Sequence, residues 1–230
     1  MKTIAIINAA GKGLRFGDET PKQYIEVKQR PILYYSLKPF ERCSHVDEIY
    51  VVCDIDYFET VEKICTGNEI TKFVRCVEGG NTANESRYLG ILNTGADDED
   101  LIILHDAARP LIKNTTIAKM IEIAHRHNHC VCGTTINANI YLNDDGKVKS
   151  LEMPSNNIFV CGMPFVCRND ILKKSFDGAF NAGTLNNSAG PMGLVNKYGD
   201  IHSYKSVEIT TIESLKITYR SDINLFEKMI

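Results

Sequence analysis

Short apolar runs alternate with segments of helical periodicity through the first half of this chain. Such alternation is typical of α/β proteins, in which each strand is followed by a helix that packs on the sheet. Because Ile49–Cys53 and Leu101–Leu104 are apolar throughout, helices are expected on both faces. The pattern predicts a mostly parallel, doubly wound sheet that binds ligands at the carboxyl ends of its strands. The predicted strands are Thr3–Asn8, Glu48–Asp54, Thr71–Val77 and Leu101–Leu104, and the predicted helices are Tyr34–Phe40, Tyr57–Ile64, Asn84–Leu92 and Thr115–His127.

The alternation of apolar runs and helical segments ends after Cys132. Residues 139–151 contain two short runs around Asp145-Gly146, a dipeptide typical of hairpin turns. A two-stranded hairpin alone is marginal in water, so this β-arm, at about residues 134–158, is expected to pack on another surface. A strand over Val207–Thr218 and a helix over Ser221–Met229 are predicted to close a single domain of residues 1–230.

The composition excludes several classes of protein. The formal net charge is -3 and no basic run occurs, which argues against a nucleic-acid partner. No eighteen apolar residues run together, so no membrane span is expected. The N-terminal apolar run is too short for a signal peptide. We therefore expect a soluble, cytoplasmic protein with a small-molecule ligand.

The eight cysteines are scattered, and several lie within apolar runs. We expect reduced thiols in the core rather than disulfides. One stretch, His125–Cys132, raises the alternative of a metal site, because His125 and His129 would share a face of a continued helix. The spacing fits no zinc pattern well, so we favour a helix that ends at His127 and is followed by a buried strand.

The glycine-rich segment Asn8–Gly17 directly follows the first strand. Small residues there let backbone N–H groups approach an anionic ligand. The segment lacks the Gly-x-x-x-x-Gly-Lys-Ser/Thr pattern of a P-loop. A dinucleotide fold is also disfavoured, because Phe16 holds its third glycine position and Asp54 comes too late to bind a ribose. What remains is a phosphate loop over Ala9–Tyr24 that presents two cationic side chains to one polyphosphate. The alternative is that these two side chains are ordinary surface charges.

Three motifs occur in order along the chain: Ala9-Ala10-Gly11-x-Gly13-x-Arg15-Phe16 with Pro21-Lys22-Gln23-Tyr24, then Glu78-Gly79-Gly80, then His105-Asp106-Ala107-Ala108-Arg109-Pro110. Together they resemble the 2-C-methyl-D-erythritol 4-phosphate cytidylyltransferases and their ribitol-5-phosphate cytidylyltransferase relatives, from Thr3 to Phe226. The resemblance implies a Rossmann-like nucleotidyltransferase fold, CTP and a divalent cation such as Mg²⁺. It also implies a homodimer with interlocking arms. The implied reaction transfers a cytidylyl group from CTP to an alditol phosphate, of the methylerythritol or ribitol type, and releases pyrophosphate.

The resemblance also implies which residues stabilise the phosphates. An acceptor phosphate oxygen would attack the α-phosphorus of CTP, so electrostatic stabilisation should be the main catalytic effect. By similarity, Arg15 and Lys22 neutralise the α-phosphate, and Lys216 approaches from the other side. Gly11 and Gly13 are expected to cradle the triphosphate.

Asp106 follows a predicted buried strand and precedes two alanines, which leave room for a ligand beside its carboxylate. A carboxylate that faces a triphosphate usually binds a cation or sugar hydroxyls. We therefore expect Asp106 to contact the nucleotide, the acceptor and a Mg²⁺ ion that the phosphates mostly hold. Arg109 is expected to bind the acceptor by similarity, with a structural pairing to a carboxylate as the alternative.

By similarity, Gly80, Asn81 and Ser86 contact the cytosine base, and the backbone of Ala9 and Ala10 closes the pocket. Asn81 stands where the family has an aspartate. Because the family's base contacts are largely made by backbone groups, preference for CTP is expected to survive this change.

The acceptor side departs from the family pattern. Relatives hold the acceptor phosphate with an arginine on the partner's arm, and Ser155 stands at that position here. The family's Thr-Pro-Gln becomes Met163-Pro164-Phe165. Loss of an arginine fork should weaken the usual acceptor by about one to two powers of ten unless another cation replaces it. Arg109 and Lys216 are the remaining candidates for that replacement. We therefore expect poor turnover of methylerythritol phosphate, with a different alditol phosphate preferred or the acceptor step impaired, while CTP binding persists.

Two alternatives stay open. The first is a nucleotidyltransferase of the same fold that uses another NTP or sugar phosphate. The second is a CTP-binding homologue with an impaired acceptor site. Pyrophosphate release with each NTP tests the first, and nucleotide binding without turnover would indicate the second.

Overall fold

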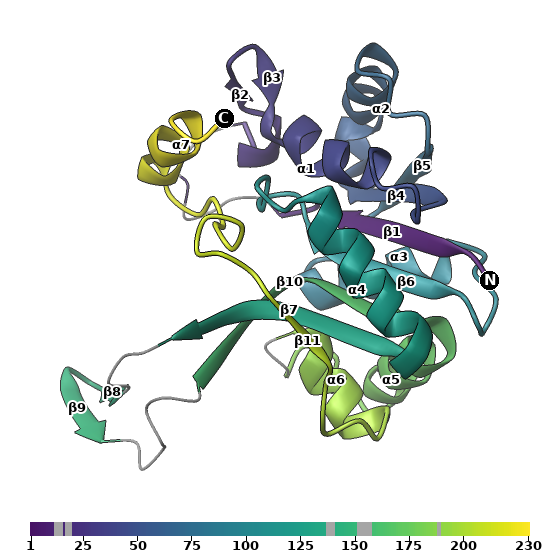
Figure 1. Cartoon of the computed structure of the whole chain (residues 1–230), viewed down its shortest axis with the longest axis vertical. Helices are drawn as coiled ribbons and strands as arrows, with labels where there is room; N and C mark the ends of the chain where they lie inside the picture. Colours follow the sequence, from purple (N-terminus) through teal and green to yellow (C-terminus); the bar gives the residue numbers. More distant parts are fainter. Residues whose placement is uncertain (12–15, 17–19, 137–140, 151–157, 188–189) are drawn as a thin grey trace.

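A seven-stranded sheet lies at the centre of the computed structural model, which describes residues 1–11, 16, 20–136, 141–150, 158–187 and 190–230 (Figure 1). The strand order is β11-β7-β10-β6-β1-β4-β5. Within this sheet β10 is antiparallel to both neighbours, and the other pairings are parallel. The predicted mostly parallel sheet is confirmed. Its strands are β1 (Thr3–Asn8), β4 (Glu48–Cys53), β5 (Phe73–Glu78), β6 (Leu101–Asp106), β7 (His129–Ile136), β10 (Ile158–Arg168) and β11 (Ser206–Glu208).

Helices cover both faces of the sheet, as the apolar strands require (Figure 1). Alternate residues of a strand point to opposite faces, so Ala5 and Ile7 pack in one core, and Ile4 and Ile6 pack in the other. The first core is covered by α1 (Ile32–Glu41), α2 (Phe58–Gly67) and α4 (Asn114–His127). The second core is covered by α3 (Ala83–Leu92), α5 (Asn169–Asn181) and α6 (Pro191–Tyr198).

A smaller cluster joins the two ends of the chain. Phe16 and Val27 pack there with Ile217 and Phe226. Phe226 belongs to α7 (Arg220–Glu227), which agrees with the predicted closing helix. The remaining short elements are the 3₁₀ turns η1 (Lys22–Tyr24) and η2 (Ile55–Tyr57) and the two-residue strands β2 (Glu26–Val27) and β3 (Arg30–Pro31).

The second half of the chain differs from the sequence pattern. No element had been predicted for β10, α5 or α6. The strand expected over Val207–Thr218 is wrong beyond Glu208. Glu213 accepts hydrogen bonds there from the backbone N–H and the hydroxyl of Thr210 (3.4 and 3.1 Å), so the chain forms a turn instead of pairing with β7.

The histidine-rich stretch is the end of a helix, as we favoured. Asn128 adopts a left-handed conformation with a φ of 66°, which terminates α4, and His129 begins β7. His125 and His129 therefore do not share a helix face. The cysteines are free and all but Cys161 are buried, in agreement with the expected core thiols. Among the helices of the described residues, none combines the length and apolar character that a membrane span needs.

The predicted arm contains a hairpin of β8 (Tyr141–Asp144) and β9 (Lys147–Ser150). Asp145 and Gly146 form its turn with φ angles of 49° and 78°, values that an Asp-Gly hairpin turn adopts readily. The hairpin lies apart from the body of the protein, beyond the ends of β7 and β10 (Figure 1).

Helix α3 packs closely on the sheet at Gly90. A Cβ there would lie 2.7 Å from Cγ2 of Ile6 and 2.9 Å from Cγ2 of Val52. We expect Gly90→Ala to lower the free energy of unfolding by about 1–3 kcal/mol, because the helix or its neighbours must move. Gly67→Ala in α2 is the matched control, since open space surrounds that position, and it should be neutral or stabilising. Urea unfolding measures both, and a wild-type midpoint for Gly90→Ala would contradict this packing.

Candidate functional site

The carboxyl ends of β1, β4, β5 and β6 meet at one edge of the sheet, where ligands were expected. Hydrogen bonds continue past the strand ends and fix the following loops. The N–H of Ala9 donates to the carbonyl of Val52 (2.7 Å). The N–H of Gly79 donates to the carbonyl of Cys53 (2.9 Å). The loops after β1 and β5 are thereby both held against β4.

A hollow of about 320 Å³ lies between the loops that follow β1, β4 and β5. Gly79 allows these loops to meet, because a Cβ there would lie 2.4 Å from the Cβ of Ala10. Three of the residues predicted to contact a base, Ala10, Gly80 and Asn81, line this hollow. Asp54 and Glu78 are also in its lining.

Ser86 lies behind the hollow rather than in its wall. Its buried hydroxyl accepts from the N–H of Gly80 (3.1 Å) and donates to the carbonyl of Thr82 (2.9 Å). Thr82 caps α3 by accepting from the N–H of Glu85 (3.2 Å). The Glu85 carboxylate accepts from the N–H of Asn81 (2.8 Å). The first turn of α3 therefore fixes the backbone that lines the hollow.

Gln23 anchors the start of the glycine-rich loop, although no role had been predicted for it. Its buried side-chain amide donates to the carbonyls of Ala9 (2.5 Å) and Gly11 (3.2 Å). The loop thus leaves β1 in a direction set by η1. Gly13 and Arg15, which were predicted to meet phosphate, lie outside the described residues.

Lys22 lies against the C-terminal segment. Its Nζ donates to the carbonyl of Ile217 (2.6 Å). The N–H of Ile217 in turn donates to the carbonyl of Ala108, just after β6 (2.8 Å). Lys22 and Lys216 were predicted to act on one phosphate from two sides, and the structure brings both to the same edge of the sheet.

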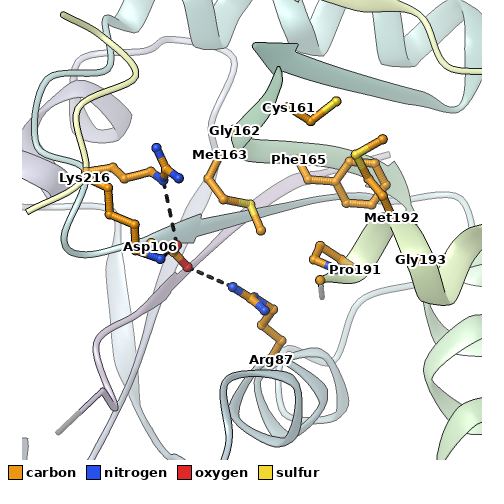
Figure 2. Close-up of a pocket in the computed structure, with 12 residues that line it drawn as sticks. Arg87, Asp106, Cys161, Gly162, Met163, Phe165, Pro191, Met192, Gly193 and Lys216 are labelled. Atoms are coloured by element: carbon orange, nitrogen blue, oxygen red, sulfur yellow. Dashed lines mark hydrogen bonds and ion pairs between the residues drawn. The ribbon is translucent and has the colours of Figure 1, made fainter. Parts of the chain in front are cut away.

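Asp106 is the centre of a buried charge cluster at the end of β6 (Figure 2). Its Oδ1 accepts from Nη2 of Arg87 at 2.9 Å. Its Oδ2 accepts from Nζ of Lys216 at 2.9 Å and lies 3.8 Å from Nε of Arg109. Burial alone would raise the pKa of the Asp106 carboxyl, but these cations, Arg87 foremost, hold that pKa well below its ordinary value. The carboxylate therefore stays ionised although it is buried.

Arg87 had not been predicted as a site residue. Successive helical residues point about 100° apart, so Ser86 contacts Gly80 while Arg87 contacts Asp106. The Arg87 side chain is buried, and Nη1 donates to Oδ1 of Asn84 (3.0 Å). A signal was present in the sequence: Asn84, Arg87 and Ile91 follow the i, i+3, i+7 spacing of the face that α3 buries.

Arg109 is fixed at the turn after β6. Its N–H donates to the carbonyl of Asp106 (3.0 Å), and Nη1 donates to the carbonyl of Ser214 (2.6 Å). Its carbonyl contacts Nε2 of His105 (3.1 Å). Burial lowers the pKa of that histidine to about 4. The Nε of Arg109 is buried without a hydrogen-bond partner among the described residues. Arg109 thus pairs with a carboxylate, as the structural alternative held. Its contact with the acceptor stays a prediction.

A cavity of about 340 Å³ lies beside the charge cluster (Figure 2). The register of β10 shifts between Cys161 and Phe165, and Gly162 and Met163 from this irregular stretch join the cavity wall. The cavity is charged on one side and mainly apolar on the other. The charged side consists of Arg87, Asp106, Arg109 and Lys216, and the other side consists of Cys161, Gly162, Met163 and Phe165 with Gly190, Pro191, Met192 and Gly193.

The described residues do not fit a magnesium ion held by the protein. Both oxygens of Asp106 already face cationic side chains, so a metal ion there would be repelled. No group of three His, Cys, Asp or Glu side chains suited to a metal ion occurs in the described part of the chain. The expected role of Asp106 as a metal ligand therefore conflicts with its surroundings.

The family model described as IspD, 2-C-methyl-D-erythritol 4-phosphate cytidylyltransferase, matches residues 3–230. The enzyme of that name from Lachnoclostridium phytofermentans is 30% identical over 222 residues, which cover 93% of each chain. The one from Lachnospira eligens is 27% identical over 219 residues, which cover 93% of this chain and 96% of the relative.

Solved structures of the same kind share the fold. The 4-diphosphocytidyl-2C-methyl-D-erythritol synthase of Anaerococcus prevotii superposes with a TM-score of 0.83 at 22% identity, over 99% of this chain and 95% of the other. The 2-C-methyl-D-erythritol 4-phosphate cytidylyltransferase of Francisella tularensis gives a TM-score of 0.81 at 22% identity, over 100% of both chains. These matches confirm the nucleotidyltransferase fold and the resemblance carried by the three motifs. The chain belongs to the IspD family of 2-C-methyl-D-erythritol 4-phosphate cytidylyltransferases.

Proposed function

We propose that this protein transfers a cytidylyl group from CTP to an alditol phosphate and releases pyrophosphate. The observation that carries the proposal is the pair of cavities beside the first two turns of α3. One is lined by the backbone of Gly80 and Asn81, and the other by the charge cluster around Asp106. The names of the family and of its relatives make 2-C-methyl-D-erythritol 4-phosphate the proposed acceptor and isoprenoid biosynthesis the proposed pathway.

In this proposal the cytosine lies in the hollow beside Ala10, Gly80 and Asn81. Fixed backbone carbonyl groups would accept a hydrogen bond from the exocyclic amine of cytosine and would repel the carbonyl of uracil, because the first is a donor and the second an acceptor. Ser86 contributes by holding Gly80 in place. The triphosphate extends over the glycine-rich loop, whose start is anchored by Gln23.

The acceptor phosphate is already anionic, so its oxygen attacks without a general base. A bond forms from that oxygen to the α-phosphorus of CTP, and the bond from the α-phosphorus to the departing pyrophosphate breaks. We assign stabilisation of the growing negative charge to Lys22 and Lys216, together with Arg15. Asp106 holds Lys216 in position through its 2.9 Å contact.

Three further features are proposed: the metal ion, the dimer and the cellular location. Mg²⁺ would arrive with CTP and be held mainly by phosphate oxygens, because Asp106 is surrounded by cations. A homodimer forms through the arm, whose exposed Tyr141 and marginal two-stranded hairpin favour a covering surface. Free cysteines suit a reducing compartment, so we place the enzyme in the cytoplasm, with no nucleic-acid or membrane partner.

The proposed activity is tested by incubating the protein with Mg²⁺, one of four NTPs and one alditol phosphate, and following pyrophosphate. The acceptors are methylerythritol, ribitol, erythritol and glycerol phosphates. We expect CTP with methylerythritol phosphate to be the fastest pair, because the family name gives this acceptor. A rate constant on the order of 10 s⁻¹ would overturn the poor turnover that Ser155 led us to expect. Faster turnover with another NTP would favour a different nucleotidyltransferase, and CTP binding without any turnover would favour a binding homologue.

We expect Lys216→Met to lower kcat by about 100- to 1000-fold, because the lost cation serves charge that grows in the transition state. Folding should persist, since this lysine is only partly buried. Lys173→Met on the outer surface of α5 is the matched control and should leave kcat unchanged. Single-turnover kinetics measure the step itself. A Lys216→Met rate close to wild type would remove this residue from the mechanism.

The dimer is tested by sedimentation of the wild type and of a variant in which a short Gly-Ser linker replaces residues 139–156. The cut preserves the pairing of Ile136 with Ile158, so the central sheet stays intact. We expect a wild-type dimer at micromolar concentration and a monomeric variant, because the arm by itself has too little core. A monomeric wild type, or a variant that still dimerises, would exclude the arm as the dimer contact.

A further inference from the structure

Arg87 lies at the boundary between the two cavities but lines only one of them. Ser86, the preceding residue, holds Gly80 at the hollow proposed for the base. Arg87 instead lines the 340 Å³ cavity, and it is absent from the lining of the hollow. Its guanidinium therefore faces the place of the acceptor rather than that of the nucleoside (Figure 2).

The charge cluster carries more positive than negative charge. Among the described residues of the cluster, Arg87, Arg109 and Lys216 surround one carboxylate, that of Asp106, which leaves an excess of two positive charges. Arg87 and Arg109 are largely buried, and buried charge without a counter-charge is costly, so the cavity favours an anion. The cluster also has N–H groups to spare. Arg87 has five N–H donors, of which its hydrogen bonds to Asn84 and Asp106 within the described residues use two.

The side chains that the structure describes on the opposite wall offer few groups that would bind hydroxyl groups. Its described side chains are those of Cys161, Met163, Phe165, Pro191 and Met192. An alditol phosphate in this cavity would therefore gain most of its polar contacts through its phosphate. Planar guanidinium groups are well suited to such a group, because they donate two parallel hydrogen bonds.

We propose that Arg87 binds the phosphate of the acceptor, with Arg109 beside it. The assignment rests on the proposed function and adds a residue to it. The family resemblance implies an arginine on the partner's arm for this task, and Ser155 stands at that position in this chain. Arg87 supplies the phosphate contact from within the same subunit, so the replacement cation that the sequence left to Arg109 or Lys216 comes from α3.

The test compares Arg87→Gln and Arg87→Lys with wild type in steady-state kinetics, with methylerythritol phosphate and CTP varied in turn. We expect Arg87→Gln to raise KM for the acceptor by about 10- to 100-fold while KM for CTP stays within about twofold. Arg87→Lys keeps the charge and should recover part of the loss. Arg168→Gln, which breaks an ion pair with Asp170 on another surface, is the control and should change neither constant.

Inorganic phosphate provides a second readout that does not require turnover. Calorimetry should show that it binds wild type and that Arg87→Gln weakens the binding by a similar factor. An unchanged acceptor KM and phosphate affinity in a folded Arg87→Gln protein would overturn the proposal. An equal rise in both KM values would also overturn it, because it would indicate a general structural role. If no alditol phosphate is a substrate, the proposed function fails, and the phosphate affinities still decide the role of Arg87.

Discussion

The buried carboxylate of Asp106 is the contact on which the site depends. It gathers Arg87 from α3, Arg109 from the turn after β6 and Lys216 from the C-terminal segment. Each side needs the other, because the cations keep the carboxylate ionised and the carboxylate lets buried cations lie close together. The cluster therefore connects three distant parts of the chain and defines the charged wall of the cavity proposed for the acceptor.

Helix α3 connects the charge cluster to the hollow proposed for the base. Gly90 lets the helix approach Ile6 and Val52 closely, and Thr82 caps its first turn. Two neighbouring side chains then serve different cavities: Ser86 fixes Gly80, and Arg87 meets Asp106. A shift of α3 would thus disturb both sides together.

The first half of the fold could be predicted because short apolar runs, typical of buried strands, alternate there with segments of helical periodicity. The motifs likewise indicated Ala10, Gly80 and Asp106, since strand ends share one edge of a parallel sheet. Arg87 was missed because its role depends on a carboxylate 19 residues later that only tertiary structure brings near. The metal role expected of Asp106 conflicts with its surroundings for the same reason: its cationic partners come from distant segments, which local sequence does not reveal.

A double-mutant cycle of Arg87→Gln and Asp106→Asn, measured by urea unfolding, tests the central contact most directly. Asp106→Asn removes the carboxylate that three cations share and should be strongly destabilising. Arg87→Gln leaves Asp106 its contacts to Lys216 and Arg109 and should cost less. The double variant should lose much less than the sum of the single losses, with a coupling energy of about 2 kcal/mol or more. Additive losses, with a coupling energy near zero, would show that the two side chains act independently and would contradict the account.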